Sequence, residues 1–331
     1  MEHKLKLRVG LSICCFLFSL APAIFAAEKI RVAFVSPTPV FAPAWIAKEA
    51  GLFAKYGLDA DVILLTGSPR LVQALIAGDV DYAMAGSTAL MRARMQGAEL
   101  AVLAASTNIS IMKLLVSRQS GLRRLEDLKG KTIGVSQYGS DADAFARIVL
   151  DQAGLKPDKD VPIMQFGGHP QVATALAAGK LEAGVLGGLA ILTARKSGAV
   201  VLADGVKLNS IAMAGTLATM RRTMQRSRDS VLRFMRAHVE AFQYFRGNRD
   251  GAVAVIQKYM GGLGLDQARF LYDEYVELFE EFPVPREKAF QGVLDHETDP
   301  KAKNFKPADF VDLSFLTEID RSGRVEKIYK K

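Results

Sequence analysis

The chain has 331 residues, of which 50% are hydrophobic and 24% are charged. This length predicts about two domains that each bury a core, and the apolar content excludes a disordered chain. The 43 Lys and Arg residues outnumber the 35 Asp and Glu residues, so the formal net charge of +8 leaves nucleic acid, a membrane surface or an anionic ligand open as partners.

The chain begins with the pattern of a secretory signal peptide. Lys4, Lys6 and Arg8 precede an apolar run at 9–20, and small residues follow the run. The run has 12 residues, whereas a membrane-spanning helix needs about 20. We therefore predict a cleaved leader and a periplasmic location for the mature protein. An exported protein seldom meets nucleic acid, so no nucleic-acid partner is expected.

Both cysteines, Cys14 and Cys15, lie in the predicted leader. The mature chain is therefore expected to have no disulfide, no thiolate nucleophile and no cysteine-ligated metal. The histidines that follow the leader, His169, His238 and His296, are too scattered for metal-ligand spacing. We predict no metal site and no cofactor.

Beyond the leader, short apolar runs alternate with helical stretches. Runs at 32–35, 62–65 and 82–85 predict strands buried on both faces. A helical stretch that begins at Trp45 ends at Gly51, where the chain turns. Strand and helix in alternation imply right-handed crossovers and a mostly parallel sheet.

The sequence then repeats itself at an offset of 101 residues. The segment GSPRLVQALIAGDVDYAMAG at 67–86 recurs as GGHPQVATALAAGKLEAGVLG at 167–187, and the first strand at 30–36 recurs at 131–137. Each half predicts strand, helix, strand, helix, strand, helix. We therefore predict an α/β fold of two doubly wound lobes with a ligand cleft between them.

Extended apolar segments near 108–117 and 208–221 are where we expect the chain to cross between the lobes. The helical C-terminal third, from Ser227, carries an apolar stripe that predicts packing against the first lobe. The predicted organisation is a leader at 1–27, a first lobe made of 28–113 and 214–331, and a second lobe made of 114–213.

Loops rich in Gly, Ser and Pro follow the predicted strands, where open α/β sheets bind their ligands. Each loop leads into a helix whose free backbone N–H groups and dipole attract anions. We expect Ser87 and Ser140 to hold an anionic group from opposite lobes, and aromatic residues to wall the pocket. The candidate ligand-binding residues are Ser36, Thr38, Phe41, Gly67, Ser68, Gly86, Ser87, Thr88, Tyr138, Gly139, Ser140, Gly168, His169 and Gly187.

The loop at 36–38 and the segments at 47–64, 74–86 and 127–140 resemble the substrate-binding proteins of nitrate, sulfonate and taurine type ABC transporters. The resemblance covers most of the mature chain. It implies a type II periplasmic binding protein fold, a small-molecule ligand, and as partners an inner-membrane permease and its cytoplasmic ATPase. We expect a monomer whose lobes close on the ligand.

Thiamine-pyrimidine synthases look similar in fold, but they use a histidine, bound pyridoxal phosphate and a cysteine-rich iron motif. A mature chain without cysteine departs from that branch, so no enzyme activity is expected. The predicted function is solute binding for an ABC importer, with a small anionic organic solute such as a sulfonate or carboxylate. A binder of a thiamine-pyrimidine precursor and a ligand-binding sensor subunit stay open as alternatives.

Overall fold

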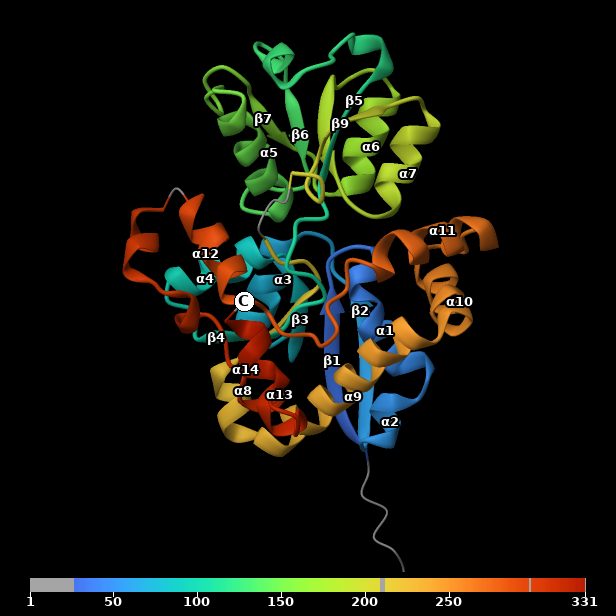
Figure 1. Ribbon diagram of the computed structural model, residues 1–331, viewed down its shortest axis with the longest axis vertical. Helices are drawn as coiled ribbons and strands as arrows, with labels where there is room; N and C mark the ends of the chain where they lie inside the picture. Colours follow the sequence, from blue (N-terminus) through green and yellow to red (C-terminus); the bar gives the residue numbers. More distant parts are fainter. Residues whose placement is uncertain (1–26, 209–211, 298, 331) are drawn as a thin grey trace, which may run out of the picture.

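The computed structural model describes residues 27–208, 212–297 and 299–330. These residues form two lobes, one above the other in Figure 1, and each lobe is built on a five-stranded sheet. The predicted α/β architecture of two lobes is confirmed. The predicted leader, apart from Ala27, lies outside the described residues.

Lobe 1 is the lower lobe of Figure 1, and its sheet has the strand order β2-β1-β3-β10-β4. Its strands are β1 (Glu28–Phe34), β2 (Leu58–Leu64), β3 (Tyr82–Ala85), β4 (Leu100–Ala104) and β10 (Thr216–Met220). Its N-terminal helices are η1 (Pro39–Phe41), α1 (Ala42–Glu49), α2 (Leu52–Lys55), α3 (Ser68–Ala77) and α4 (Ser87–Met95).

Lobe 2 repeats this plan with the strand order β7-β6-β8-β5-β9. Its strands are β5 (Lys113–Val116), β6 (Ile133–Val135), β7 (Ile163–Gln165), β8 (Ala183–Leu186) and β9 (Val200–Asp204). Its helices are η2 (Arg118–Ser120), η3 (Leu125–Leu128), α5 (Asp141–Gln152), α6 (His169–Ala177) and α7 (Leu189–Lys196).

The sequence repeat is realised element by element. Strands β3 and β8 both begin and end 101 residues apart, and helices α3 and α6 begin at that same spacing. Four strands of each sheet run in one direction, because only β10 and β5 are antiparallel to both of their neighbours. These two strands lie in the segments predicted to cross between the lobes, and the mostly parallel sheets are as expected.

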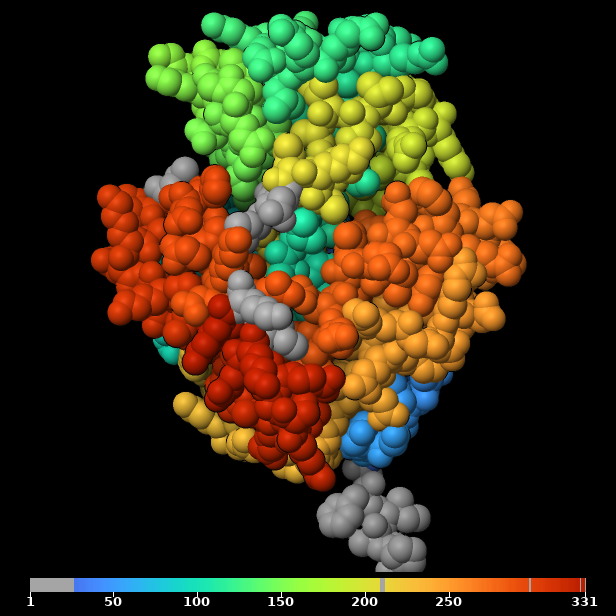
Figure 2. All heavy atoms as spheres, viewed as in Figure 1, coloured from blue at the N-terminus to red at the C-terminus, as the bar shows by residue number. Residues whose placement is uncertain are grey.

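The C-terminal third wraps over lobe 1. Its helices are α8 (Arg221–Arg226), α9 (Arg228–Gly247), α10 (Arg249–Tyr259), α11 (Leu265–Val276), α12 (Glu287–Asp295), η4 (Pro300–Asn304), η5 (Pro307–Asp309), α13 (Ser314–Ile319) and α14 (Arg324–Tyr329). Helix α9 packs on α1, and Val311 bridges to Val102 of the edge strand β4. In Figure 2 this part of the chain, orange to red, covers the front of lobe 1 and extends up to lobe 2.

Aromatic packing fixes this C-terminal cover to the sheet. Trp45 is fully buried and stacks on Tyr259 at 5.1 Å between ring centroids, while Tyr82 stacks on Phe234 at 3.7 Å. Such buried rings contribute large apolar areas to the core. Trp45 therefore belongs to the core of lobe 1.

Candidate ligand-binding site

Two adjacent cavities lie between the lobes. The first, here the α12 cavity, has a free volume of about 30 Å³ and is walled by α4, α5 and the end of α12. The second, here the loop cavity, has a free volume of about 40 Å³ and is walled by the loops that follow the strands. Both cavities include Ile111, Met112, Asp141 and Ala214 in their walls. Each has room for only a few water molecules, so the lobes are closed on one another.

The two chain segments that connect the lobes form the floor between the cavities. Thr107 and Ala214 exchange backbone hydrogen bonds, with N···O distances of 3.1 and 3.2 Å. Paired in this way, the outgoing and returning segments lie side by side. They form the natural axis about which the lobes can open.

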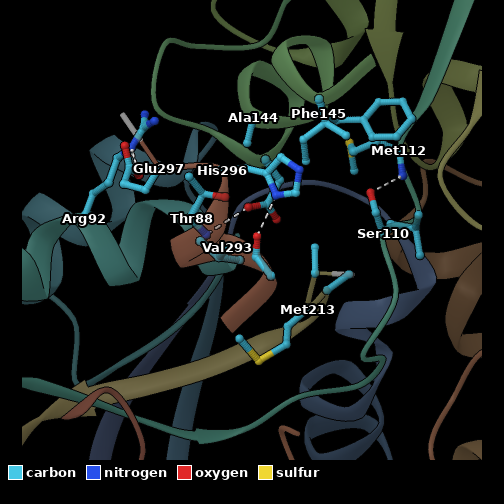
Figure 3. Close-up of a pocket in the computed structure, with 16 residues that line it drawn as sticks. Thr88, Arg92, Ser110, Met112, Ala144, Phe145, Met213, Val293, His296 and Glu297 are labelled. Atoms are coloured by element: carbon cyan, nitrogen blue, oxygen red, sulfur yellow. Dashed lines mark hydrogen bonds and ion pairs between the residues drawn. The ribbon is translucent and has the colours of Figure 1, made fainter. Parts of the chain in front are cut away.

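The loop cavity brings together seven of the predicted residues from both lobes. They are Ser36, Thr38, Phe41, Ser68 and Gly86 from lobe 1, and Ser140 and His169 from lobe 2. Thr88 lines the α12 cavity (Figure 3). The loops after several different strands therefore converge on one place, as the carboxyl ends of parallel strands do.

Three predicted glycines, Gly67, Gly139 and Gly168, lie where the closed lobes touch, and a fourth, Gly187, lies beside the segment that leads into lobe 2. Gly67 and Gly168 of opposite lobes leave no room for a Cβ atom beside Gln137 and Thr66, respectively. Gly139 faces the guanidinium of Arg92, and Gly187 lies against Met112 and His169. The first three glycines permit close approach of the lobes, and none of the four lines a cavity.

Two further predicted residues, Ser87 and Tyr138, also line neither cavity. Ser87 is fully buried, and its Oγ donates to the carbonyl of Met213 at 3.2 Å. Gly86 is the N-cap residue of α4, and the expectation that Ser87 holds an anionic group stays a prediction, because its hydroxyl has a backbone partner in this closed form. Tyr138 is 48% exposed, and its hydroxyl donates to the carbonyl of Ile163 at 2.9 Å.

The other hydroxyl groups of the loops have partners within their own lobe. Ser140 caps α5 by accepting from the N–H of Asp143 at 3.4 Å, and its Oγ lies 3.0 Å from that of Ser136. Ser68 accepts from the N–H of Gly86 at 3.0 Å. These bonds hold each loop in one shape before a ligand arrives, which lowers the cost of ordering on binding.

A carboxylate from lobe 2 occupies the start of α4. The N–H of Thr88 donates to Oδ1 of Asp141 at 3.0 Å, across the cleft. Burial raises the pKa of the Asp141 carboxyl, and hydrogen bonds from Thr88 and Ser87 oppose that rise. A Cβ atom on Gly86 would stand 2.6 Å from the carboxyl carbon of Asp141, so this approach depends on glycine.

Arg92 joins α4 to two other parts of the molecule. Its Nε donates to Oε2 of Glu297 at 2.6 Å, and its Nη1 lies 3.8 Å from Oδ2 of Asp143 in lobe 2. Beside it, Nδ1 of His296 lies 2.9 Å from the carbonyl of Gly292. Figure 3 shows Arg92 and Glu297 side by side at one end of the cavity, with Phe145 and Met112 at the other.

His169 enters the loop cavity as the first residue of α6. Burial lowers its pKa to about 4, with hydrogen bonding to the backbone of Val185 acting in the opposite direction. The imidazole is therefore neutral near pH 7. Its Nδ1 is buried and has no hydrogen-bond partner among the described residues. A solute in the loop cavity can satisfy this nitrogen.

Sequence reasoning missed part of the site. Asp141 follows Ser140 directly, in a loop that the sequence singled out, but only its neighbours were chosen as ligand-binding residues. Arg92 lies one helical turn beyond Thr88, so the helix period of α4 was an available signal. His296 and Glu297 arrive from the C-terminal third by tertiary packing, and no local pattern predicts that.

The described ranges contain neither a group of three or more metal-binding side chains nor a helix long and apolar enough to span a bilayer. The strand order of each sheet and the two-lobed arrangement are those of the type II periplasmic binding protein fold. Residues 38–252 match the model of the family described as NMT1/THI5 like. The chain belongs to this family.

Curated relatives match only part of the chain. A protein of Brucella abortus (strain 2308) that is named as a binding protein is 33% identical over 164 residues. This match covers 49% of this chain and 49% of the Brucella protein. The chain thus spans about half the length of the curated relatives it matches.

Solved structures match almost the whole chain. A protein of Bordetella bronchiseptica RB50 has a TM-score of 0.79 at 20% identity, over 88% of this chain and 96% of that one. The alkanesulfonate-binding protein SsuA of Xanthomonas axonopodis pv. citri, bound to MOPS, has a TM-score of 0.68 at 21% identity, over 82% of this chain and 92% of that one. At these identities the likeness establishes the shared fold.

Proposed function

We propose that the protein is the extracytoplasmic solute-binding component of an ABC importer. It captures a small anionic organic solute, such as a sulfonate or carboxylate, between its lobes and delivers it to an inner-membrane permease. The observation that carries this proposal is the enclosure of both cavities by loops of the two lobes and by the segments that connect them. A solute reaches such cavities only when the lobes open, and closure then buries it.

The chemistry of the loop cavity supports a small polar solute. Ser36 and Thr38 offer hydroxyl groups on one side, and His169 offers an unpartnered ring nitrogen on the other. Helices α3 and α6 both start at this cavity and contribute the positive ends of their dipoles. The N–H groups at these two helix starts would supply donors to an anionic group from both lobes, whereas the neutral His169, which donates to the backbone of Val185, offers Nδ1 as an acceptor for an N–H or O–H group of the solute.

The relatives support the same role. The Brucella protein is named as a binding protein, and SsuA is named as an alkanesulfonate-binding protein. The predicted leader at 1–27 supports export. A protein that only binds its solute needs no catalytic group. The hydroxyl groups of Ser68, Ser136 and Ser140 agree with such a role, because they are already hydrogen-bonded within their own lobes.

A precursor of the thiamine pyrimidine is a second candidate solute. Phe41 borders the loop cavity and Phe145 borders the α12 cavity, and aromatic walls of this kind suit a flat ring. A sensor subunit that binds the same solute would use the same cavities. Genes for a permease and an ATPase beside this one would favour transport over sensing.

A thermal-shift screen of the mature protein tests the proposal. The set contains alkanesulfonates, short carboxylates, nitrate and pyrimidines, and calorimetry follows for each compound that raises the melting temperature. We expect an organic sulfonate or carboxylate to bind with a one-to-one stoichiometry. Binding of pyrimidines alone would favour the second candidate, and absence of binding across the set would contradict the proposal.

A further inference from the structure

The edge strand β9 of lobe 2 is open, whereas the corresponding edge of lobe 1 is covered. Strands β4 and β9 hold the same last place in the two sheets. Val102 of β4 is 1% exposed, but Val200 and Val201 of β9 are 50% and 39% exposed. An uncovered edge presents backbone N–H and C=O groups with which another chain can pair.

A short segment of the C-terminal third covers β4. Val102 forms a parallel bridge with Val311 of this segment. The N–H of Val102 donates to the carbonyl of Phe310 at 2.8 Å, and its carbonyl accepts from the N–H of Asp312 at 2.9 Å. Lobe 1 thus shows how an extended segment completes an edge of this kind.

Strand β9 pairs with its neighbour in the register that β4 uses. Both strands run antiparallel to their neighbours, and each pairing shifts at a bulge. Beside the bulge, Val102 of β4 is paired with Ala218, and Val201 of β9 is paired with Leu115. We therefore expect the backbone N–H and carbonyl of Val201 to face outward, as those of Val102 do. Within the described ranges, no segment forms an equivalent bridge to β9.

The repeat also places an arginine beside each of the two edges. In lobe 1, Nε of Arg94 on α4 donates to the carbonyl of Asp309 in the covering segment at 3.3 Å. The counterpart of Arg94 in the repeat is Arg195 on α7, which borders the groove beside β9. Among the described residues, Arg195 forms neither an ion pair nor a side-chain hydrogen bond. Lobe 2 therefore has a free cation where lobe 1 uses one to hold its covering segment.

The groove beside β9, here the β9 groove, has a free volume of about 550 Å³. Its charged walls are the basic residues Lys113, Arg195 and Lys207 and the acidic residues Asp204 and Glu274. Lys113 is paired with Asp204 at 3.1 Å. This pairing leaves two cations and one carboxylate to face an occupant, so the groove favours an acidic segment over a basic one.

We propose that the β9 groove binds an extended, acidic segment of a partner protein by strand addition. The segment lies parallel to β9 and pairs with the backbone of Val201, as the segment at 310–312 pairs with Val102. An apolar residue of the segment covers the exposed valines, and acidic residues beside it meet Arg195 and Lys207. Main-chain hydrogen bonds supply the affinity in this mode of recognition, and side-chain contacts supply the specificity. The solute cleft takes no part, so this inference stands apart from the proposed function.

A peptide with the sequence KPADFVDLS, which copies the segment at 306–314 that covers β4, tests the proposal. The peptide carries a fluorescent label, and its anisotropy is measured as the mature protein is added. We expect saturable binding with a one-to-one stoichiometry. Methylation of the backbone nitrogen that corresponds to Asp312 removes the donor to β9 and should weaken binding about 10-fold or more. Equal binding of the methylated peptide, or no saturation of the unmethylated one up to about 1 mM protein, would overturn the inference.

Three protein variants locate the bound peptide. Arg195→Gln should weaken binding about five-fold or more, because it removes a charge-assisted hydrogen bond. Arg123→Gln, which removes an exposed charge elsewhere on lobe 2, and Arg94→Gln, beside the covered edge, should each change the affinity by less than about two-fold. A loss in Arg94→Gln with none in Arg195→Gln would place the peptide at β4 and overturn the inference. Equal affinities of Arg195→Gln and Arg123→Gln would overturn it as well.

A second copy of this chain is the competing occupant, since two open edges can pair with each other. Sedimentation of the wild type and of Val201→Lys distinguishes the two cases, because a charged side chain on an edge strand opposes such pairing. We expect both proteins to be monomers. A wild-type dimer that Val201→Lys dissociates would show that β9 pairs with itself, and would overturn the inference.

Discussion

The Oγ of Ser87 donates a hydrogen bond to the carbonyl of Met213 at 3.2 Å, and both residues are buried. This bond joins the start of α4 to the segment that returns from lobe 2. Ser87 therefore holds the floor of the cleft in place, and its hydroxyl is not directed to either cavity.

Ser87→Ala should lower the free energy of unfolding by about 1 kcal/mol, because the carbonyl of Met213 loses its donor inside the protein. Ser87→Asp should cost several times more, since it buries a second carboxylate beside Asp141. Urea unfolding measures both effects. Ser197→Ala is the control, because Ser197 also donates to a backbone carbonyl but is exposed. Equal losses at positions 87 and 197 would contradict this account.

A substitution at Gly188 tests how closely the two lobes approach each other. It has φ +57°, and a Cβ atom there would stand 2.9 Å from the carbonyl of Pro37 and overlap Thr38 in lobe 1. Gly188→Ala should therefore keep the lobes apart, which increases the radius of gyration with solute present. Solute binding should weaken by about 10-fold or more, which corresponds to a loss of about 1.4 kcal/mol or more in binding free energy.

Gly167→Ala is the matched control for this experiment. Gly167 also has positive φ, +89°, but a Cβ atom there meets nothing within 4 Å. Both substitutions strain the backbone of lobe 2, and only Gly188→Ala should alter closure. If the two variants scatter alike with solute present, contact between Gly188 and Thr38 does not limit closure.

Because His238 is buried in its neutral form, we expect the folded protein to lose stability in acid. Burial lowers its pKa to about 4, and neither ring nitrogen has a hydrogen-bond partner in the described part of the chain. Between pH 6.5 and 4 the unfolded chain binds a proton that the folded protein refuses, so the free energy of unfolding falls as pH falls through this window. A single group of this kind contributes about 3 kcal/mol in total.

The variant His238→Leu should remove this contribution. His169 has a pKa that is also lowered to about 4, so part of the pH dependence should remain in the variant. Denaturant unfolding at pH 7 and pH 4.5 provides the comparison. Identical losses of stability in the wild type and in His238→Leu would show that His238 is not buried in its neutral form.

Arg92→Gln should weaken the attachment of the C-terminal third to α4. The side chain of Glu297 is buried and would lose an ion pair of 2.6 Å, at a cost of about 2 kcal/mol in unfolding free energy. Arg249→Gln is the control, because Arg249 and Asp273 are paired at 2.7 Å but are exposed, and such pairs contribute about 0–1 kcal/mol. A loss at Arg92 no greater than that at Arg249 would contradict the structural role of Arg92.

The repeat made most of the fold predictable. A spacing of 101 residues placed β8 and α6 from β3 and α3, because each half had to bury the same pattern of apolar residues. The loops after the strands were predictable for the same reason, since glycine and serine mark the turns into helices. Seven of the loop residues chosen from the sequence meet at the loop cavity.

The contacts across the cleft were not predictable from local pattern. Asp141 reaches Thr88 only because two independently folded lobes close on each other, and no periodicity records how they meet. For Ser87 the pattern of a loop before a helix start predicted an anion-binding residue, but the hydroxyl donates to the carbonyl of Met213 in the returning segment. His296 lines the α12 cavity only because the C-terminal third packs over lobe 1, and that packing joins residues that are far apart in the sequence.

We expect the two lobes to close on a small solute that is held between them. The distance between spin labels at Arg70 and Thr174 tests it most directly, because both sites are exposed and the chain after residue 27 contains no cysteine to interfere with labelling. With the solute identified by the thermal-shift screen at saturation, the distance distribution should become shorter and narrower than in the solute-free protein. An unchanged distribution at saturation would contradict closure of the lobes on the solute.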